Sequence, residues 1–187
     1  MAQSKILLDS NSYFRLAKSI HPLLDVVFGD DNYCLYVLEE LDDEFSRSRR
    51  LRDQFSWVAD PEYASNRKKR LTLSRKERRE IDQTIEYLTQ HKMENLLGVS
   101  PVDIQCLAYG HVLGIPVVTD DGDMLDLANA FGIYAIKTLH LMEWMLSCGH
   151  IDMTKVHQVV GYWAYIGDKP GNFRADYQEI FGEDPPA

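Results

Sequence analysis

The sequence has few cysteines and no long apolar run. Its three cysteines, Cys34, Cys106 and Cys148, are odd in number, widely spaced and set among apolar residues. We therefore expect reduced, buried thiols, and we exclude a disulfide framework and a cysteine metal site. The apolar stretch that begins at Ile6 is much shorter than a signal-peptide core or a membrane span. These absences predict a cytoplasmic protein without a membrane partner.

Glycine-rich phosphate motifs and histidine metal sites are also missing from the sequence. There is neither a P-loop nor a glycine fingerprint for dinucleotides, and the six histidines have no metal-ligand spacing. The chain contains no internal repeat and no low-complexity segment. Nucleotide cofactors and a histidine-held metal ion are therefore not expected.

What the chain does contain is the composition of an ordinary globular domain with an uneven charge. It has 187 residues, of which 45% are hydrophobic and 26% are charged, and this predicts one domain over residues 1–187. The net charge is −9, yet residues 47–79 contain 12 Lys/Arg and only 4 Asp/Glu. A local excess of positive charge is the electrostatic footprint of phosphate contact, whatever the sign of the total.

Four short apolar stretches are typical of buried strands. They cover residues 5–9, 33–38, 115–119 and 133–136. Apolar residues at helical spacing follow them along the chain. The pair Ser100-Pro101 favours a helix start, and Gly114 is placed to end that helix. Strands that alternate with helices predict an α/β fold with a central parallel sheet and helices on both of its faces.

Two further segments add helices to this arrangement. Residues from about 46 to 92 are basic and then acquire helical spacing, which indicates a basic helical insertion. Residues from about 138 to 187 indicate a helical C-terminal extension with two helices. Within it, Trp144 with Met142 and Met145 indicates core packing or a contact in a homodimer.

Acidic residues gather where the expected strands end. Asp9 ends the first strand, and the turn Asp120–Asp123 follows the third. Glu39 and Glu40 come after the second strand. Because parallel sheets bind ligands outside the carboxyl ends of their strands, these acids should lie close together. Clustered carboxylates repel one another, so a cation usually accompanies them, and oxygen ligands suit Mg²⁺ or Mn²⁺. A cation in such a site can promote the attack of water on a phosphodiester.

Each acid also has a local structural explanation. An acid before Ser-Asn can cap a helix, and Ser-x-x-Asp is nearly a capping box. Acids in a first helical turn complement the helix dipole, and acids in a turn can simply be solvated. Asp9 can be the helix cap, and Asp103 can belong to the capping box. Glu39 and Glu40 can complement the helix dipole. Asp120, Asp121 and Asp123 can lie in a solvated turn. Their joint arrangement around one sheet edge favours a functional interpretation.

Four short motifs, spread over most of the chain, resemble those of the PIN-domain nucleases. The first is Asp9-Ser10-Asn11 after an apolar strand, and the second is Leu38-Glu39-Glu40-Leu41. The third is Ser100-Pro101-Val102-Asp103, with Ala108 and Gly114 behind it. The fourth is the stretch Val117-Val118-Thr119-Asp120-Asp121-Gly122-Asp123. Each motif is short, so the resemblance depends on finding four of them in order and on the expected elements.

The resemblance implies a fold, an activity and a set of site residues. The fold is a PIN-like three-layer sandwich around a central parallel sheet, and the activity is that of an endoribonuclease dependent on Mg²⁺ or Mn²⁺. The acids implied in catalysis are Asp9, Glu40, Asp103 and Asp121. The metal ligands implied are Asp9, Asp103, Asp121 and Asp123, with Asn11, Ser100 and Thr119 in support.

The resemblance also implies partners. The family includes toxins that cleave RNA and are restrained by a separate antitoxin, so an RNA substrate and an antitoxin protein are expected. The stretch between Glu40 and Asp103 and the tail after Ile136 exceed those of compact family members. This extra length leaves a housekeeping or defence nuclease open.

The 12 Lys/Arg of residues 47–79 form a basic stripe that has three interpretations. It can be a phosphate track for RNA, with Phe55, Trp57 or Tyr63 available to stack an unpaired base. It can also be a solvated helical arm or a docking surface for an acidic protein. The residues expected to contact RNA in the first interpretation are Arg67, Lys68, Lys69, Arg70, Arg75 and Lys76.

Two functions from other classes stay open. A phosphoacceptor signalling domain also combines a doubly wound sheet with an acidic pocket, and its buried lysine would have to be Lys137. The phosphorylated mid-sheet aspartate of such domains is not evident in the sequence. A catalytically silent PIN-like module would bind RNA or protein through the basic stripe without cutting it.

Overall fold

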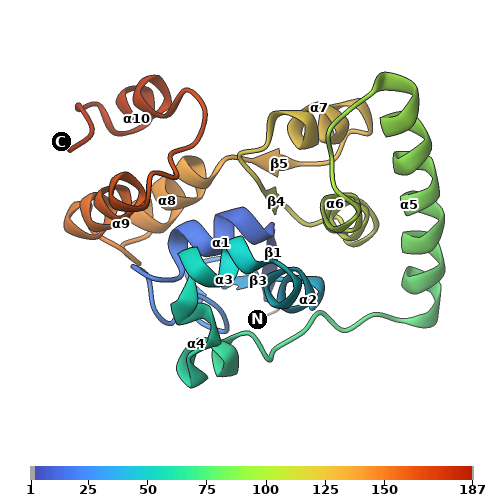
Figure 1. The fold of residues 1–187 in the computed structure, drawn as a ribbon, viewed down its shortest axis with the longest axis horizontal. Helices are drawn as coiled ribbons and strands as arrows, with labels where there is room; N and C mark the ends of the chain where they lie inside the picture. The colour runs from blue at the N-terminus through green and yellow to red at the C-terminus, as the bar shows by residue number, and fades with distance from the viewer. Residues whose placement is uncertain (1–2, 187) are drawn as a thin grey trace.

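A computed structural model describes residues 3–186 as an α/β structure built on a five-stranded, mostly parallel sheet (Figure 1). The strand order is β2-β3-β1-β4-β5, which puts β1 in the middle. Strands β3, β1, β4 and β5 run parallel, and only β2 at the edge is antiparallel. The bounds are β1 Ser4–Leu8, β2 Val27–Phe28, β3 Tyr33–Tyr36, β4 Val117–Val118 and β5 Ala135–Ile136.

The sheet separates two hydrophobic cores because successive side chains of a strand point to opposite faces. On β1, Ile6 and Leu8 belong to the first core and Leu7 to the second. On β4, Val118 and Val117 divide between the cores in the same way. All five side chains are at most 1% exposed. The expected sheet with helices on both faces is therefore confirmed.

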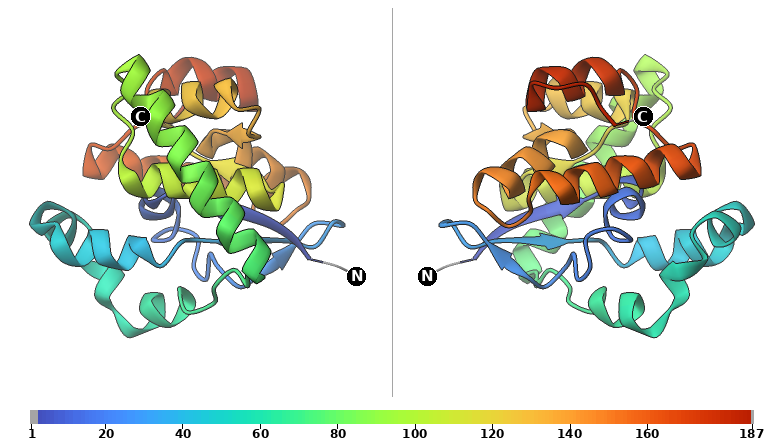
Figure 2. Two further views of the ribbon diagram at one scale, coloured as in Figure 1. Left: turned by 90° about the vertical axis from the view of Figure 1, so that its right-hand side faces the viewer. Right: turned by 90° about the vertical axis from the view of Figure 1, so that its left-hand side faces the viewer.

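Helices cover both faces of this sheet (Figure 2). Buried residues of α5, α6 and α7 belong to the second core, and those of the other helices belong to the first. The first group consists of α1 Ser10–Leu16, α2 Glu40–Arg47, α3 Arg49–Gln54, the 3₁₀ turn Ser56–Ala59, α4 Pro61–Asn66, α8 Thr138–Ser147, α9 Met153–Ile166 and α10 Phe173–Phe181. The second group consists of α5 Arg75–Asn95, α6 Pro101–Leu113 and α7 Gly122–Ala130.

Helix α6 begins and ends as the sequence predicts. Ser100 is its N-cap and Pro101 its first residue, where the missing proline N–H costs no hydrogen bond. Gly114 follows the last turn with φ of 61°, a left-handed conformation that glycine adopts without strain. These two ends set the position of Asp103, which lies in the first turn of the helix.

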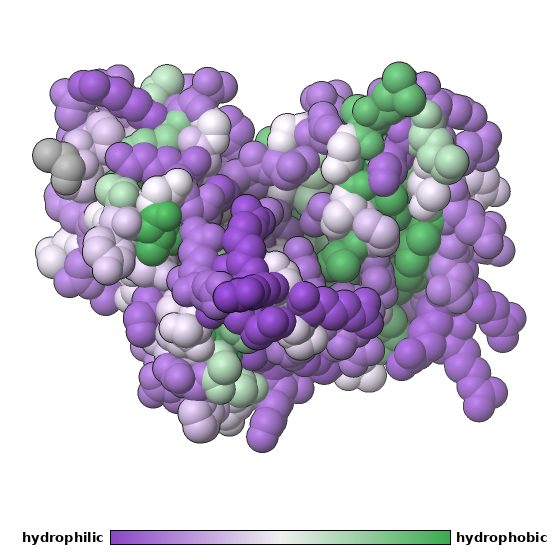
Figure 3. All heavy atoms as spheres, in the orientation of Figure 1, coloured by the Kyte–Doolittle hydropathy of each residue, from purple (hydrophilic) through white to green (hydrophobic). Residues whose placement is uncertain are grey.

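Helix α5 lies at the side of the molecule and is strongly two-faced. Its Ile81 and Leu88 are buried against the second core, whereas its arginines and lysines point outward. In Figure 3 hydrophobic side chains gather where α5 meets α6, and hydrophilic ones project from its outer side. Ser74 and Glu77 form a capping box that starts the helix, a signal that the sequence analysis did not use.

The structure corrects three of the expectations about elements and thiols. The C-terminal segment has three helices instead of two, because the short helix α10 buries only Phe173 and Tyr177 and leaves a weak periodic signal. The edge strand β2 has two residues and no detectable pattern. Cys148 is exposed, whereas Cys34 and Cys106 are buried as expected.

Between residues 3 and 186, none of the helices has the length and apolar character needed to cross a membrane.

Candidate functional site

Asp9 stands at the carboxyl end of the central strand and at the start of α1. Its backbone N–H donates to the Val118 carbonyl at 3.0 Å, so Asp9 follows β1 beside the end of β4. Its side chain accepts a hydrogen bond of 2.6 Å from the Ser12 N–H and caps α1. One oxygen of the Asp9 carboxylate therefore caps the helix, as the local explanation predicted. The other oxygen is the one that the functional interpretation concerns.

The environment of Asp9 disfavours its charged form. The residue is 4% exposed, and burial raises the pKa of its carboxyl group to about 7. Hydrogen bonds from Thr119 and Ser12 lower this pKa, and the nearby charge of Asp120 raises it slightly further. A bound cation would offset the cost of burying this charge, which is what a metal ligand requires.

Asp103 meets Asp9 from the opposite helix layer. The Ser100 N–H donates to the Asp103 carboxylate at 3.1 Å, and the Asp103 N–H donates to the Ser100 hydroxyl at 3.2 Å. This complete capping box holds the carboxylate in place. Asp9 and Asp103 line one small cavity with room for about one water molecule. Its other lining residues are Leu8, Ser10, Leu38, Leu41, Val102 and Cys106.

Glu40 lies on the same side of the sheet edge. Its carboxylate accepts a hydrogen bond of 2.6 Å from the Gln105 amide on α6, which fixes its orientation. Between these acids lies the Cys106 thiol. Burial raises the pKa of this thiol, and the charges of Asp9, Asp103 and Glu40 raise it further. Three of the four acids expected in catalysis are therefore near enough to the Cys106 thiol to raise its pKa.

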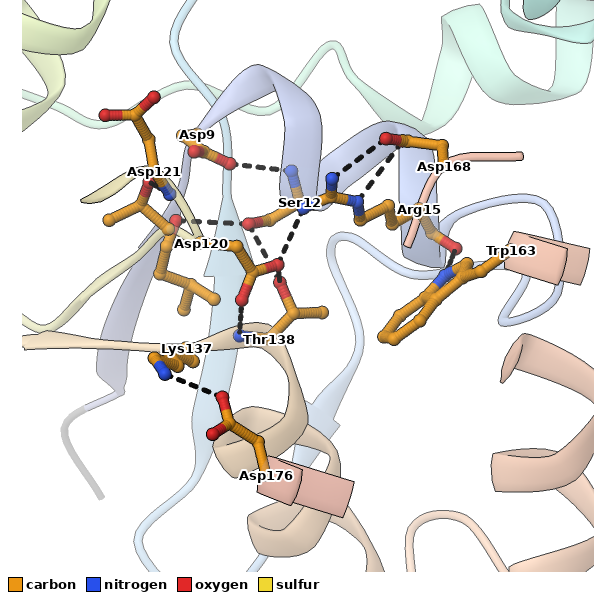
Figure 4. Close-up of polar contacts among 12 residues, drawn as sticks. Asp9, Ser12, Arg15, Asp120, Asp121, Lys137, Thr138, Trp163, Asp168 and Asp176 are labelled. Carbon is orange, nitrogen blue, oxygen red and sulfur yellow. Dashed lines mark hydrogen bonds and ion pairs between the residues drawn. The ribbon is translucent and has the colours of Figure 1, made fainter. Parts of the chain in front are cut away.

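The fourth acid, Asp121, adjoins Asp9 through Thr119. The Thr119 hydroxyl accepts a hydrogen bond of 3.1 Å from the Asp121 N–H and also contacts the Asp9 carboxylate. The Asp121 carboxylate caps α7 by accepting from the Met124 N–H at 2.8 Å, and the residue is exposed. Figure 4 shows Asp9 and Asp121 at neighbouring strand ends. Thr119 therefore contacts both the backbone of Asp121 and the side chain of Asp9.

Two other expected residues are not brought to the cavity. The Asp123 carboxylate accepts a hydrogen bond of 2.5 Å from the Gly98 N–H, which ties α7 to the loop before α6. Asn11 is exposed in the first turn of α1. The position of Asp123 does not support the role in metal binding that the motif implies for it. The position of Asn11 does not support the implied role in positioning.

Asp120 belongs to an interior network that the sequence analysis missed. Its carboxylate accepts from Arg15 at 2.8 Å and from the Thr138 hydroxyl at 2.6 Å (Figure 4). Arg15 also pairs with Asp168 at 2.9 Å, which joins α1 to the turn before α10. A lone arginine in the apolar run from Tyr13 to Ala17 was the available signal, because a buried guanidinium needs an acidic partner.

The acids at the cavity provide part of the ligand set that a hard divalent cation needs. Within residues 3–186, no group of three histidine, cysteine or acidic side chains is arranged as a metal site. Asp9 and Asp103 nevertheless both line one cavity. Mg²⁺ typically binds proteins through one or two carboxylates and completes its shell with water and substrate phosphate. The number of carboxylates at this cavity is the number through which proteins typically bind Mg²⁺.

Lys137 does not have the place that a phosphoacceptor domain needs. Its ammonium group pairs with Asp176 on α10 at 2.6 Å, and both side chains are partly exposed. In Figure 4 this pair points away from Asp9. The position disfavours a signalling domain of that type.

The basic stripe is partly a structural element. Arg67 is 4% exposed, and its guanidinium donates to the Tyr13 hydroxyl at 3.0 Å, to the Val58 carbonyl at 3.0 Å and to Asp42 at 2.9 Å. The prediction that Arg67 contacts RNA is therefore wrong, because its guanidinium is buried and bound to groups of the protein itself. Arg70 also pairs with Asp42, at 2.9 Å.

The remaining cations are on the surface. Lys69 pairs with Asp25, and Lys76 lies 3.5 Å from Glu80 with 84% of its side chain exposed. Lys68 and Arg75 are exposed as well. These four side chains are accessible to a phosphate backbone.

The aromatic residues expected to stack on bases are core residues. Phe55, Trp57 and Tyr63 are 3%, 7% and 5% exposed, and they pack against one another and against α1. Their role in stacking was a wrong prediction. The run lacks helical periodicity, so its burial depended on contacts distant in sequence.

In comparisons with known proteins, no protein-family model and no curated protein matches this chain.

Proposed function

We propose that this chain is a divalent-metal-dependent endoribonuclease with a PIN-like fold. The observation that supports this most is the convergence of Asp9 and Asp103, from elements far apart in sequence, on one small cavity at the carboxyl end of the central strand. Glu40 and Asp121 adjoin that cavity. Burying the charge of Asp9 at such an edge is costly unless a ligand compensates it, so its convergence with Asp103 supports a function.

Each side chain has a distinct task in this proposal. Asp9 and Asp103 would supply the carboxylate oxygens that hold Mg²⁺ or Mn²⁺, and Asp9 would have to be deprotonated to do so. Glu40, oriented by Gln105, positions the attacking water and accepts its proton. Ser100 and Thr119 hold Asp103 and Asp9 in place. When bound, the cation supplies Lewis acidity and neutralises charge on the scissile phosphate.

Cleavage of single-stranded RNA tests the proposal. The protein would be freed of metal with EDTA, and the rate would be measured after addition of Mg²⁺ or Mn²⁺. Cleavage should require the metal. The substitution Asp103→Asn, which keeps an oxygen for the capping box, should lower the rate about a hundredfold or more, as does loss of other electrostatic groups in active sites.

The matched control is Asp126→Asn on α7, which removes an exposed acid outside the cavity. It should cleave at the wild-type rate. Equal rates for wild type and Asp103→Asn would refute the proposed site. RNA binding without cleavage at any metal concentration would instead identify a silent RNA-binding module.

A further inference from the structure

A second pocket lies beside the carboxylate cavity and combines cations, acids and an aromatic ring. It has a volume of about 160 Å³. Glu39 and Glu40 form one wall at the start of α2, and Arg70 and Arg78 come from the loop after α4 and from α5. Tyr109 of α6 also lines it. Leu71 and Leu73 provide apolar surface, since they pack partly buried against the second core.

Of the two arginines that line this pocket, Arg78 is the one available to bind an anionic ligand. Arg70 is shared with Asp42 and with the Arg67 carbonyl. Arg78 is exposed on α5, and within residues 3–186 it forms no ion pair with an acidic side chain. A solvated guanidinium at the mouth of a pocket is suited to a phosphate group.

Tyr109 is half-buried and lines the same pocket as Glu40 and Arg78. Burial raises the pKa of its hydroxyl, the charge of Glu40 raises it further, and the charge of Arg78 lowers it. Aromatic rings in this setting stack on nucleic-acid bases.

The pocket adjoins the proposed catalytic cavity. Leu38 lines both hollows, and Glu40 lines the pocket while its charge reaches Cys106 in the cavity wall. A strand of RNA with one nucleotide in the pocket would place a neighbouring phosphodiester beside Asp9 and Asp103.

We propose that this pocket binds one nucleotide of single-stranded RNA, with its phosphate on Arg78, its base against Tyr109 and its hydroxyl or amino groups on Glu39. The inference rests on the proposed function and gives the same site its substrate class. A ribonucleotide offers an anion, hydrogen-bond donors and an aromatic face together. A bare anion or an acidic peptide would meet the repelling carboxylates of Glu39 and Glu40 without using them.

Binding of a short fluorescent oligouridylate, measured by anisotropy in EDTA, tests this without any cleavage. Arg78→Ala should weaken binding about tenfold, which is typical for removal of a good contact to nucleic acid. The control Arg79→Ala removes the next arginine of α5, which is exposed and does not line the pocket. Its effect should stay below about twofold. Tyr109→Leu should weaken binding about tenfold, whereas Tyr109→Phe keeps the ring and the affinity.

Competition identifies the ligand. Uridine 5′-monophosphate should displace the RNA at lower concentration than inorganic phosphate, and poly-glutamate should not displace it. Equal competition by phosphate would reduce the pocket to an anion site, and displacement by poly-glutamate would assign it to a protein partner. Either result overturns the proposal.

The outcomes separate this inference from the nuclease proposal. Equal affinities for Arg78→Ala and Arg79→Ala in a protein that cleaves RNA would overturn the nucleotide pocket alone. Selective loss of binding in Arg78→Ala, in a protein that does not cleave with any metal, would support the pocket and refute the nuclease.

Discussion

At the scale of single residues, Asp9 is a group whose structural and functional demands conflict. Its carboxylate caps α1, but it is buried beside other acids. Its pKa of about 7 means that the folded protein keeps a proton here that the unfolded chain releases near pH 4. The charged form is therefore a destabilising element that a cation would relieve.

This conflict predicts the pH dependence of stability. Between pH 4 and 7 the folded state binds more protons at Asp9 than the unfolded state does, so stability contributed by this group falls as pH rises through that window. The difference is on the order of 4 kcal/mol. Asp9→Asn, an equally good helix cap, should remove the effect. Denaturant unfolding in EDTA should show the free energy of unfolding of the variant increasing relative to that of wild type from pH 4 to 7. Above pH 7 the difference should stay constant.

A constant difference between the two proteins over that range would mean that Asp9 has an ordinary pKa. Comparison with wild type is needed because Glu77, Glu183 and Asp184, whose pKa values are lowered by hydrogen bonds, change stability in the opposite direction.

Arg67 and Lys68 are neighbours with opposite roles. Arg67→Ala would leave the Tyr13 hydroxyl and the Val58 carbonyl without their donor, and we expect the free energy of unfolding to fall by about 1–3 kcal/mol. Lys68→Ala, at an exposed position, should change it by less than about 0.5 kcal/mol. Urea denaturation of both variants measures this directly. Similar stabilities would contradict the buried position of Arg67.

At the scale of elements, α5 and the loop before it carry the side chains of the basic stripe that are accessible to phosphate. Lys68, Arg75 and Lys76 project outward there. Helix α5 also holds Arg78 at the pocket beside Glu40. The element thus carries exposed cations and also lines the pocket beside Glu40.

Salt dependence of RNA binding tests the track. Replacing Lys68, Arg75 and Lys76 by alanine should reduce the slope of log affinity against log salt by about 0.7 for each RNA phosphate that the variant no longer neutralises. Turnover at saturating RNA should persist, since phosphate contacts position the strand. The control Lys169→Ala lies in the turn before α10 and should leave the slope unchanged. An unchanged slope in the triple variant would make the stripe a solvated surface.

At the scale of the whole molecule, the sequence predicted what local patterns encode. Apolar runs followed by acids located the strand ends, and Ser100, Pro101 and Gly114 located α6, so the positions of Asp9 and Asp103 followed. These signals fall within a few residues of each other. The parallel order of the strands then brought the acids together.

What the sequence could not predict depends on distant contacts. Arg67 pairs with Asp42, and Asp120 pairs with Arg15, across separations that leave no local pattern. Phe55 and Trp57 are buried by α1, which precedes them by about 40 residues. The sequence therefore overstated the RNA-binding set and the acidic cluster, because it treated paired charges as available ones.

Binding of Mn²⁺, followed by the electron paramagnetic resonance signal of the free ion, tests the central claim that Asp9 and Asp103 hold a divalent cation. The wild-type protein should deplete free Mn²⁺, and more so above pH 7, because protons compete with the cation at Asp9. Asp103→Asn should weaken the affinity about tenfold or more, and Asp126→Asn should match wild type. Equal Mn²⁺ binding by wild type and Asp103→Asn would contradict the account.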